Sequence, residues 1–218
     1  MKNKKTFIAI FAIMILTLAG VSGYYWYNNA RYVTTEDAKV DADVIKVSPQ
    51  ISGKIIQIDA ASGDTVKEGQ ILARLDEANL PKDANLDRTL VRTPIDGRVV
   101  YVPAHEGEIG APGQPVVMVV DTSDMYISAN IEETDLSKVK PGQYVEVTID
   151  SIPGKTFDGK VDSIRGASLS TFSLLPSSNA SGNFTKVVQR VPITIKLDDY
   201  AGQPLVVGTN AIIRIHIK

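Results

Sequence analysis

The sequence of 218 residues lacks cysteine and has only two histidines and one tryptophan. Without cysteine there are no disulfides, thiolate metal ligands or cysteine nucleophiles. His105 lies in a glycine-rich turn and His216 on the polar face of a predicted strand. Neither has a carboxylate or a second histidine at a spacing typical of a metal site or general base. The sequence also lacks a phosphate-binding loop, a nucleophile elbow and a dinucleotide fingerprint. We therefore expect no enzyme activity, metal or cofactor.

Charge of one sign is not concentrated anywhere in the chain. The 23 basic and 25 acidic residues give a formal net charge of −2, and no basic run is present. Nucleic-acid-binding domains carry a basic patch or stripe, so nucleic acid is not expected as a partner. A hydrophobic content of 44% predicts a folded protein and not a disordered one.

One long uncharged run, residues 7–27, follows three lysines at the N-terminus. As an α-helix it would be ~31 Å long, enough to cross the hydrocarbon core of a bilayer. Lysines on the short flank predict a cytoplasmic N-terminus, and Tyr24–Tyr27 would form an interfacial aromatic belt. We predict that residues 1–27 form a cytoplasmic stub and a single-pass anchor in the cell membrane, with the bulk of the chain outside. The alternative is a signal peptide cleaved after Val21–Gly23.

Residues 45–76 and 92–121 have the pattern of two copies of one motif. Three pairs of glycines match without a gap: Gly53 with Gly97, Gly63 with Gly107, and Gly69 with Gly113. Such glycines predict turns with positive φ, each followed or preceded by a short strand. Each copy could bury one face only against the other. The two halves and a short connector, residues 77–91, are therefore expected to form one domain.

Longer strands with period-two alternation follow from residue 122. Residues 143–149, 191–197 and 211–218 each place apolar side chains on one face, which indicates antiparallel sheet. We predict a small antiparallel β-barrel over residues 122–218, preceded by a membrane-proximal strand or linker at 28–44. A short helix is expected at Glu132–Val139.

A long loop at residues 165–185 interrupts this second domain. It is rich in serine, glycine and asparagine but carries large apolar residues, and loops of this length are typically functional or mobile. Its apolar side chains could pack under the barrel as a lid or form an exposed patch for a partner. The candidate partner-binding residues are Phe172, Leu174, Leu175, Asn179, Asn183, Phe184, Gln189 and Arg190.

Several motifs together resemble a known family. The first half contains Val47-Ser48-Pro49 and Ser52-Gly53-Lys54-Ile55, and the second contains Arg92-Thr93-Pro94-Ile95-Asp96-Gly97 and Pro112-Gly113-Gln114-Pro115. They resemble the split lipoyl (biotinyl-like) domain of HlyD-type membrane fusion proteins, the periplasmic adaptor subunits of efflux and secretion systems. Tyr32-Val33-Thr34-Thr35 and the run at 172–192 are similar to the EmrA-like branch.

This resemblance implies a mainly β fold, in which a lipoyl-like β-sandwich built from two half-motifs precedes the barrel. It also implies a non-catalytic adaptor for multidrug efflux. The adaptor would self-associate and would bind an inner-membrane exporter of the major-facilitator type, which supplies the energy.

The chain departs from the family between the two halves. Family members insert a long α-helical hairpin there, whereas here only Pro81-Lys82-Asp83 separates sequences that resemble its start and its end. So few residues cannot form two antiparallel helices, and Pro81 would break a helix. The hairpin is either naturally absent or excised from a longer parent, and the near-seamless join favours excision. An outer-membrane channel is expected as a partner only of a parent with the hairpin.

Three alternative functions remain open. The chain could serve an ABC-type exporter, or it could be a structural module without a transporter. It could also be a lipoyl or biotinyl carrier acylated on Lys82. Carriers resemble Met-Lys-Met or Asp-Lys-Ala in a tight hairpin, whereas Lys82 lies in Pro-Lys-Asp. A mass increment for lipoyl or biotin would identify a carrier.

Overall fold

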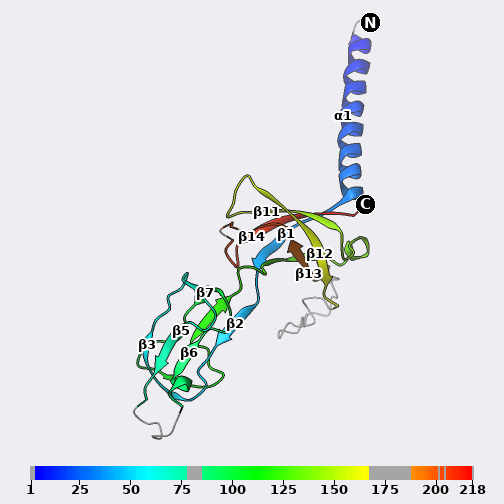
Figure 1. Cartoon of the computed structure of the whole chain (residues 1–218). Helices are drawn as coiled ribbons and strands as arrows, with labels where there is room; N and C mark the ends of the chain where they lie inside the picture. The colour runs from blue at the N-terminus through cyan, green and yellow to red at the C-terminus, as the bar shows by residue number, and fades with distance from the viewer. Residues whose placement is uncertain (1–2, 78–84, 167–187, 201, 204, 218) are drawn as a thin grey trace, which may run out of the picture. The chain divides into compact units, whose positions relative to one another are not determined.

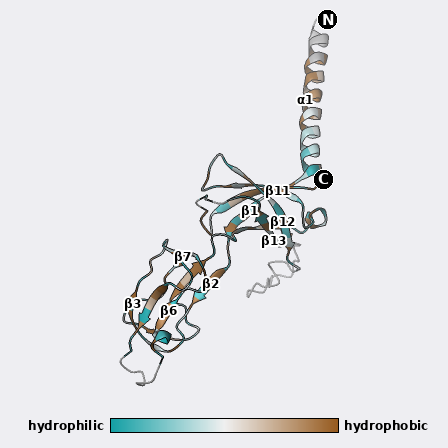
Figure 2. Ribbon diagram, viewed as in Figure 1, coloured by the Kyte–Doolittle hydropathy of each residue, from teal (hydrophilic) through white to brown (hydrophobic). Residues whose placement is uncertain are grey.

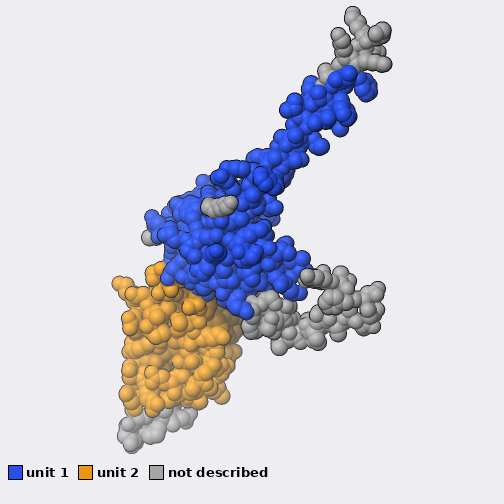
Figure 3. All heavy atoms as spheres, turned by 90° about the vertical axis from the view of Figure 1, so that its right-hand side faces the viewer, with its two compact units in different colours: residues 1–40, 126–218 blue, residues 41–125 orange. Residues whose placement is uncertain are grey.

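A computed structural model describes residues 3–77, 85–166, 188–200, 202–203 and 205–217. The chain divides into two compact units, which Figure 3 colours separately. Residues 41–125 form the first, here named the sandwich unit. Residues 1–40 and 126–218 form the second, the barrel unit, so the sandwich unit is inserted into the sequence of the barrel unit.

The barrel unit begins with helix α1, Asn3–Arg31. Its apolar side chains, including Phe7, Leu16 and Trp26, are exposed, and Figure 2 shows hydrophobic colouring on the half of the helix towards the N-terminus. A helix that is apolar all round needs an apolar surrounding. The segment Ile10–Arg31, with a mean hydropathy of 1.5, is long and apolar enough to cross a membrane.

Six strands form a closed barrel after this helix (Figure 1). In their order around the ring they are β1 (Tyr32–Asp41), β10 (Tyr126–Glu132), β13 (Arg190–Leu197), β12 (Thr156–Ile164), β11 (Tyr144–Ile149) and β14 (Asn210–His216). The pairs β1–β14, β10–β13, β13–β12, β12–β11 and β11–β14 are antiparallel. The predicted alternation is confirmed on β11, where Val145, Val147 and Ile149 are buried, and on β14, where Ile213 and Ile215 are buried.

Residues 28–44, where a membrane-proximal strand or linker is expected, contain strand β1. Residues 28–31 end α1, and Tyr32–Asp41 is not a linker but a barrel strand. It pairs with the last strand, from Tyr32 opposite His216 to Lys39 opposite Asn210. Without β1, β14 and β10 would expose unpaired edges. The short helix expected at Glu132–Val139 is reduced to the 3₁₀ helix η2, Leu136–Lys138, because Glu132 still belongs to β10.

The sandwich unit contains two four-stranded sheets. One has the order β2 (Val44–Val47), β9 (Val117–Val120), β7 (Gly97–Tyr101) and β4 (Thr65–Val66). The other has the order β6 (Leu90–Arg92), β5 (Ile71–Leu75), β3 (Gly53–Ile58) and β8 (Ile109–Gly110), and the 3₁₀ turn η1, Leu86–Thr89, leads into β6. Each sheet combines strands from both copies of the repeat, so neither half makes a sheet of this kind alone.

Reciprocal hydrogen bonds join the two halves. They form two matched pairs: Gly63 N–H to Val99 O (2.8 Å) with Gly107 N–H to Ile55 O (2.7 Å), and Val99 N–H to Asp64 O (2.9 Å) with Ile55 N–H to Glu108 O (2.8 Å). Each of these four bonds has its counterpart at the equivalent position of the other half. A core that includes Ile55, Leu72, Val99 and Val119 lies between the sheets. The repeat in the sequence therefore corresponds to an internal pseudo-symmetry.

Glycine is favoured at the repeated positions for two different structural reasons. Gly63, Gly69, Gly107 and Gly113 have φ between 78° and 96°, a conformation that favours glycine. The same expectation is wrong for Gly53 and Gly97, which open strands without a positive φ. At Gly97 a Cβ would lie 2.1 Å from the carbonyl oxygen of Val120, so the close approach of two strands requires the glycine there.

Candidate functional site

The long loop leaves the barrel after β12 and returns at β13. Its flanks are held by backbone bonds, from Arg165 N–H to Pro192 O (3.0 Å) and from Glu133 N–H to Gln189 O (2.9 Å). Gln189 and Arg190, two of the candidate partner-binding residues, belong to this loop base. The other six lie outside the described residues: Phe172, Leu174, Leu175, Asn179, Asn183 and Phe184.

A polar network crosses three barrel strands at the loop base. The guanidinium of Arg190 on β13 forms an ion pair with the Asp37 carboxylate on β1. Between them on β10, Asn130 donates its Nδ2–H to Asp37 Oδ1 at 3.0 Å. Thr35 Oγ1 donates to the Asn130 carbonyl (3.0 Å) and accepts the Asp37 N–H (3.1 Å). A β-bulge between Thr35 and Ala38 lies at this point of β1, and bulges re-aim side chains.

This network positions the loop more than it stabilises the barrel. The side chains of Arg190 and Asp37 are 55% and 40% exposed. Exposed ion pairs contribute about 0.2–1 kcal/mol. The network nevertheless fixes where the chain leaves the loop and enters β13, because it ties that point to β1 across β10.

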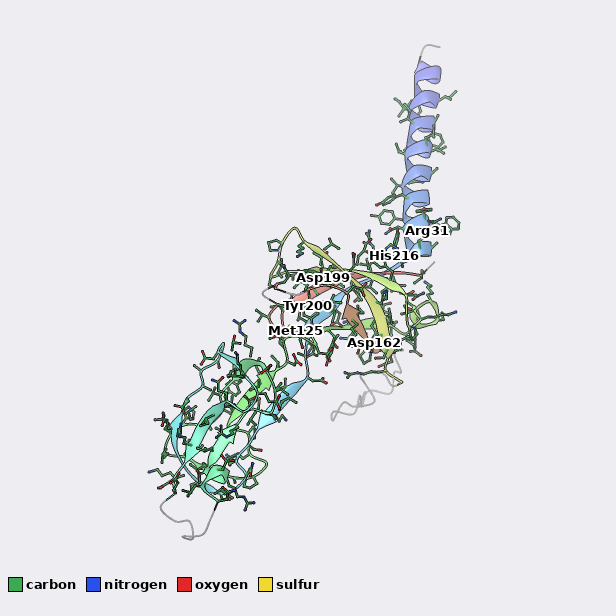
Figure 4. All side chains as sticks on the ribbon, in the orientation of Figure 1. Arg31, Met125, Asp162, Asp199, Tyr200 and His216 are labelled. Atoms are coloured by element: carbon green, nitrogen blue, oxygen red, sulfur yellow. The ribbon has the colours of Figure 1, made fainter. Side chains whose placement is uncertain are left out.

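A second cluster lies on the barrel rim that adjoins α1. The ring of His216 is in edge contact with Tyr32 (centroids 4.8 Å apart) and with Tyr144 (4.9 Å), and its Nε2 lies 3.1 Å from Glu146 Oε1. Figure 4 labels His216 and Arg31 at this junction. The guanidinium of Arg214 lies 5.0 Å from the centroid of the Tyr32 ring. Strands β1, β11 and β14 each contribute side chains to this cluster. The cluster therefore links β1, the first strand of the barrel, to β14, the last.

The phenol of Tyr144 is an anchor within this cluster. It donates a hydrogen bond to Asp158 Oδ1. That bond, followed by desolvation and by repulsion from nearby carboxylates, raises the pKa of Tyr144 to about 12. The phenol therefore remains protonated and able to donate at physiological pH.

Each histidine lies beside a carboxylate in the structure, whereas the sequence analysis considered only spacings typical of a metal site or general base. His216 faces Glu146, and His105 Nδ1 lies 3.3 Å from Glu108 Oε1. Glu146 is 70 positions away in sequence and is brought close by the β11–β14 register, so local spacing could not reveal it. Within the described ranges no three His, Cys, Asp or Glu side chains are grouped so that they could hold a metal ion.

Comparisons with known proteins match both units. The barrel-sandwich hybrid domain of RND-type membrane fusion proteins matches residues 43–122, and the YknX-like beta-barrel domain matches residues 125–215. The putative efflux system component YhbJ of Bacillus subtilis is 35% identical over 93% of this chain and 88% of its own length. The multidrug export protein EmrA of Haemophilus influenzae is 40% identical over 62% of this chain. The chain belongs to the EmrA-like membrane fusion proteins.

The fold of this membrane fusion protein is found in solved relatives. The structure of the periplasmic adaptor protein EmrA matches 85% of the chain and 98% of its own with a TM-score of 0.59, at 17% identity. The chain spans only about a third of the H. influenzae EmrA sequence, which is matched over 35% of its length. YhbJ, by contrast, is matched over most of its length.

Sequence reasoning found two residues of the loop base in this membrane fusion protein and missed Asp37, Asn130 and Thr35. These three lie on β1 and β10, far in sequence from Arg190. The motif Tyr32–Thr35 drew attention to the segment, but no local signal indicated that it would become a barrel strand. Only the barrel topology shows that these residues are neighbours.

Proposed function

We propose that this membrane fusion protein is the extracytoplasmic adaptor of a multidrug efflux system and works with an inner-membrane exporter of the major-facilitator type. Its likeness to the efflux component YhbJ, over 93% of the chain and through both domains, carries the proposal. Helix α1 would anchor it with the N-terminus in the cytoplasm and with both units on the outer side. The names of EmrA and YhbJ describe those proteins and support the assignment here.

The mechanism is organisational and not catalytic. Copies of the chain would assemble around the exporter, and the two rigid β units would form part of the wall of a conduit. The exporter would supply the energy. The loop at residues 165–185 would contact the exporter, since its two ends are fixed on the barrel by Arg165 and by the Arg190–Asp37 pair.

The short connector supports a naturally short adaptor. Seven residues, 78–84, separate Glu77 from Asn85. YhbJ has 88% of its length matched to this chain, so it too has no room for a long inserted hairpin. This favours natural absence over the excision that the near-seamless join suggested. Such an adaptor would bind its exporter without reaching a distant channel through a hairpin.

Cross-linking in native membranes tests the proposal. The tagged full chain is cross-linked, purified and analysed by mass spectrometry, and a major-facilitator permease is expected as the dominant partner. An ABC permease instead would retain the adaptor role and reject the exporter type. Absence of any permease would reject the adaptor function.

A loop variant locates the contact in the same experiment. Combined Phe172→Ser, Leu174→Ser and Leu175→Ser substitutions should reduce the captured permease at least about fivefold, because apolar anchors dominate interface energies. Val206→Ser, at an exposed apolar residue of the barrel unit outside the loop, serves as the control and should leave capture unchanged. If the loop variant and the control variant captured equal amounts of permease, the loop would not be part of the interface.

A further inference from the structure

Two hollows lie where α1 meets the barrel rim. The larger, of about 500 Å³, is lined by Asn29 and Ala30 of α1 and by Lys138, Lys140 and Ile217 of the barrel. We name it the lysine hollow. The other, of about 420 Å³, shares Asn29 with it and is lined by aromatic residues, including Trp26 and Tyr32.

The position of the lysine hollow follows from the length of α1. The uncharged residues 7–27 fill ~31 Å, which matches the hydrocarbon core. Helical residues 28–31 extend about 6 Å further, and the headgroup layer on each side of a bilayer is about 5–8 Å deep. Ile217 N–H donates to the Arg31 carbonyl at 3.0 Å, so the barrel rim begins at the same depth. The lysine hollow therefore lies in the lipid headgroup layer.

The charges around the lysine hollow are mainly positive. Lys138 is paired with Asp135 (2.7 Å), whereas among the described residues the Lys140 ammonium has no carboxylate partner. At the end of α1, the Arg31 guanidinium lies over the Tyr27 ring at 4.6 Å from its centroid. The residues that line the lysine hollow thus include two lysines and no carboxylate. Such a site attracts a phosphate and not an amine.

The backbone that carries the two lysines is fixed in place. The side chain of Gln143 donates from Nε2 to the Lys138 carbonyl at 3.1 Å, and its Oε1 accepts the Lys140 N–H at 2.8 Å. Between them, Pro141 and Gly142, with φ +86°, form a tight turn. The backbone of this turn therefore needs little ordering when a ligand binds, which lowers that part of the cost of binding.

We propose that the lysine hollow binds the phosphate of an anionic phospholipid from the surrounding leaflet. The ammonium groups of Lys138 and Lys140 would hold the phosphate diester as point charges, and the Asn29 amide would donate to it. The aromatic residues beside it suit the border between headgroups and acyl chains. The bound lipid would fix the depth and rotation of the barrel at the membrane. The inference depends on α1 spanning the membrane and not on the identity of an exporter.

The single tryptophan gives a direct measurement. Trp26 precedes Asn29 and Ala30 by three and four residues, which places it one turn away on the same helix face. The full chain is reconstituted in nanodiscs of phosphatidylcholine and phosphatidylglycerol, with bromine on only one lipid, at equal mole fraction. Brominated phosphatidylglycerol should quench Trp26 at least about twofold more than brominated phosphatidylcholine. Equal quenching by both lipids would overturn the proposal.

Charge-matched variants locate the preference. Lys138→Gln with Lys140→Gln should bring the quenching ratio to about one. Lys140→Gln alone keeps the Asp135–Lys138 pair and should lower the ratio partway. Lys54→Gln with Lys67→Gln removes the same charge from the sandwich unit and should leave the ratio unchanged. The proposed site would be overturned if the quenching ratio stayed high in Lys138→Gln with Lys140→Gln. It would also be overturned if the ratio fell as much in Lys54→Gln with Lys67→Gln.

Inorganic phosphate distinguishes a lipid from a soluble ligand of the same chemistry. Chloride is replaced by inorganic phosphate at equal ionic strength in the native protein. If the quenching ratio of the two brominated lipids is retained, a lipid occupies the hollow. If the quenching ratio falls to one, the site binds free phosphate and the lipid proposal is overturned. No exporter is present in any arm, so these results are independent of the proposed efflux function.

Discussion

Gly53 and Gly97 occupy equivalent positions in the two halves of the repeat, yet their surroundings differ. A Cβ at Gly97 would lie 2.1 Å from the Val120 carbonyl oxygen, whereas one at Gly53 would meet Leu75 at 3.4 Å, an ordinary contact. Sequence comparison finds both glycines and assigns them one reason. The two glycines differ because their strands pack differently on the neighbouring strands. The repeat pattern in the sequence does not show this difference in packing.

Alanine at the two positions should therefore have unequal effects. Gly97→Ala must push β7 away from β9 and is expected to lower the free energy of unfolding of the sandwich unit by about 2–3 kcal/mol. Gly53→Ala should lower it by less than about 1 kcal/mol. Hydrogen exchange of peptides from β7 and β9 measures this loss. Equal loss of protection in both variants would show that β7 and β9 separate easily.

Tyr144 allows a second prediction about a single residue. Its pKa is raised from 10.0 to about 12, chiefly by its bond to Asp158, so Asp158→Asn should return it towards 10. Because the folded-state pKa is the higher one, the stabilisation from this bond is present below pH 10 and is lost as the pH rises through 12. The phenolate absorbance of native and Asp158→Asn protein, each compared with its Tyr144→Phe variant, measures the titration. An unchanged pKa in Asp158→Asn would exclude Asp158 as the cause.

At the level of elements, strands with strict alternation could be predicted as parts of the barrel, whereas residues 28–44 could be predicted only as a strand or linker. The apolar faces of β11, β13 and β14 are buried as their patterns indicate. In β1 a bulge shifts the register between Thr35 and Ala38 and breaks the alternation. Its partners also come from the far end of the chain, so local sequence gives no sign that the barrel needs it.

The loop base depends on the same long-range pairing. Sequence analysis could name Arg190, because the run around it is distinctive, but could not name Asp37 as its partner. The side-chain amide of Asn130 links them only because β10 lies between β1 and β13. The sequence therefore indicates the candidate site only by its composition, and the structure adds how the base of the loop is held.

Arg190→Gln should separate positioning from stability. We expect the free energy of unfolding in urea to change by less than about 1 kcal/mol, because the pair is exposed. Capture of the proposed exporter should fall, because the loop loses one of its two fixed ends. Lys160→Gln, which removes the exposed pair of Lys160 with Asp198 on the same barrel, is the control and should change neither quantity. A large stability loss in Arg190→Gln would make the pair structural instead.

The two halves of the sandwich unit are interleaved at the scale of the whole molecule. Each sheet takes strands from both, and the reciprocal backbone bonds join Gly63 to Val99 and Gly107 to Ile55. Of the described connector residues, only Leu90 and Val91 belong to a sheet, at the start of β6. Sequence periodicity predicted the matched halves, but it did not predict that each sheet would mix them.

Cutting the connector should consequently leave the unit intact. A protease site inserted between Leu80 and Pro81 allows cleavage after folding, and the two fragments should elute together with the hydrogen-exchange protection of the uncut protein. Urea should separate them, because no covalent link remains. Fragments that separate in native buffer would show that the interleaved sheets depend on the connector.

Because β1 pairs with β14, the barrel cannot close until β14 has been synthesised. The first strand made after the anchor has as its partner β14, the last of the six barrel strands along the chain, with Tyr32 opposite His216. A ribosome that stops early would leave β1 with an unsatisfied edge beside the membrane, and such edges recruit other strands. The sandwich unit, encoded wholly between β1 and β10, has all its strands long before that point. An interrupted product would thus present a finished sandwich and an open barrel, which a quality-control protease could distinguish from the completed chain.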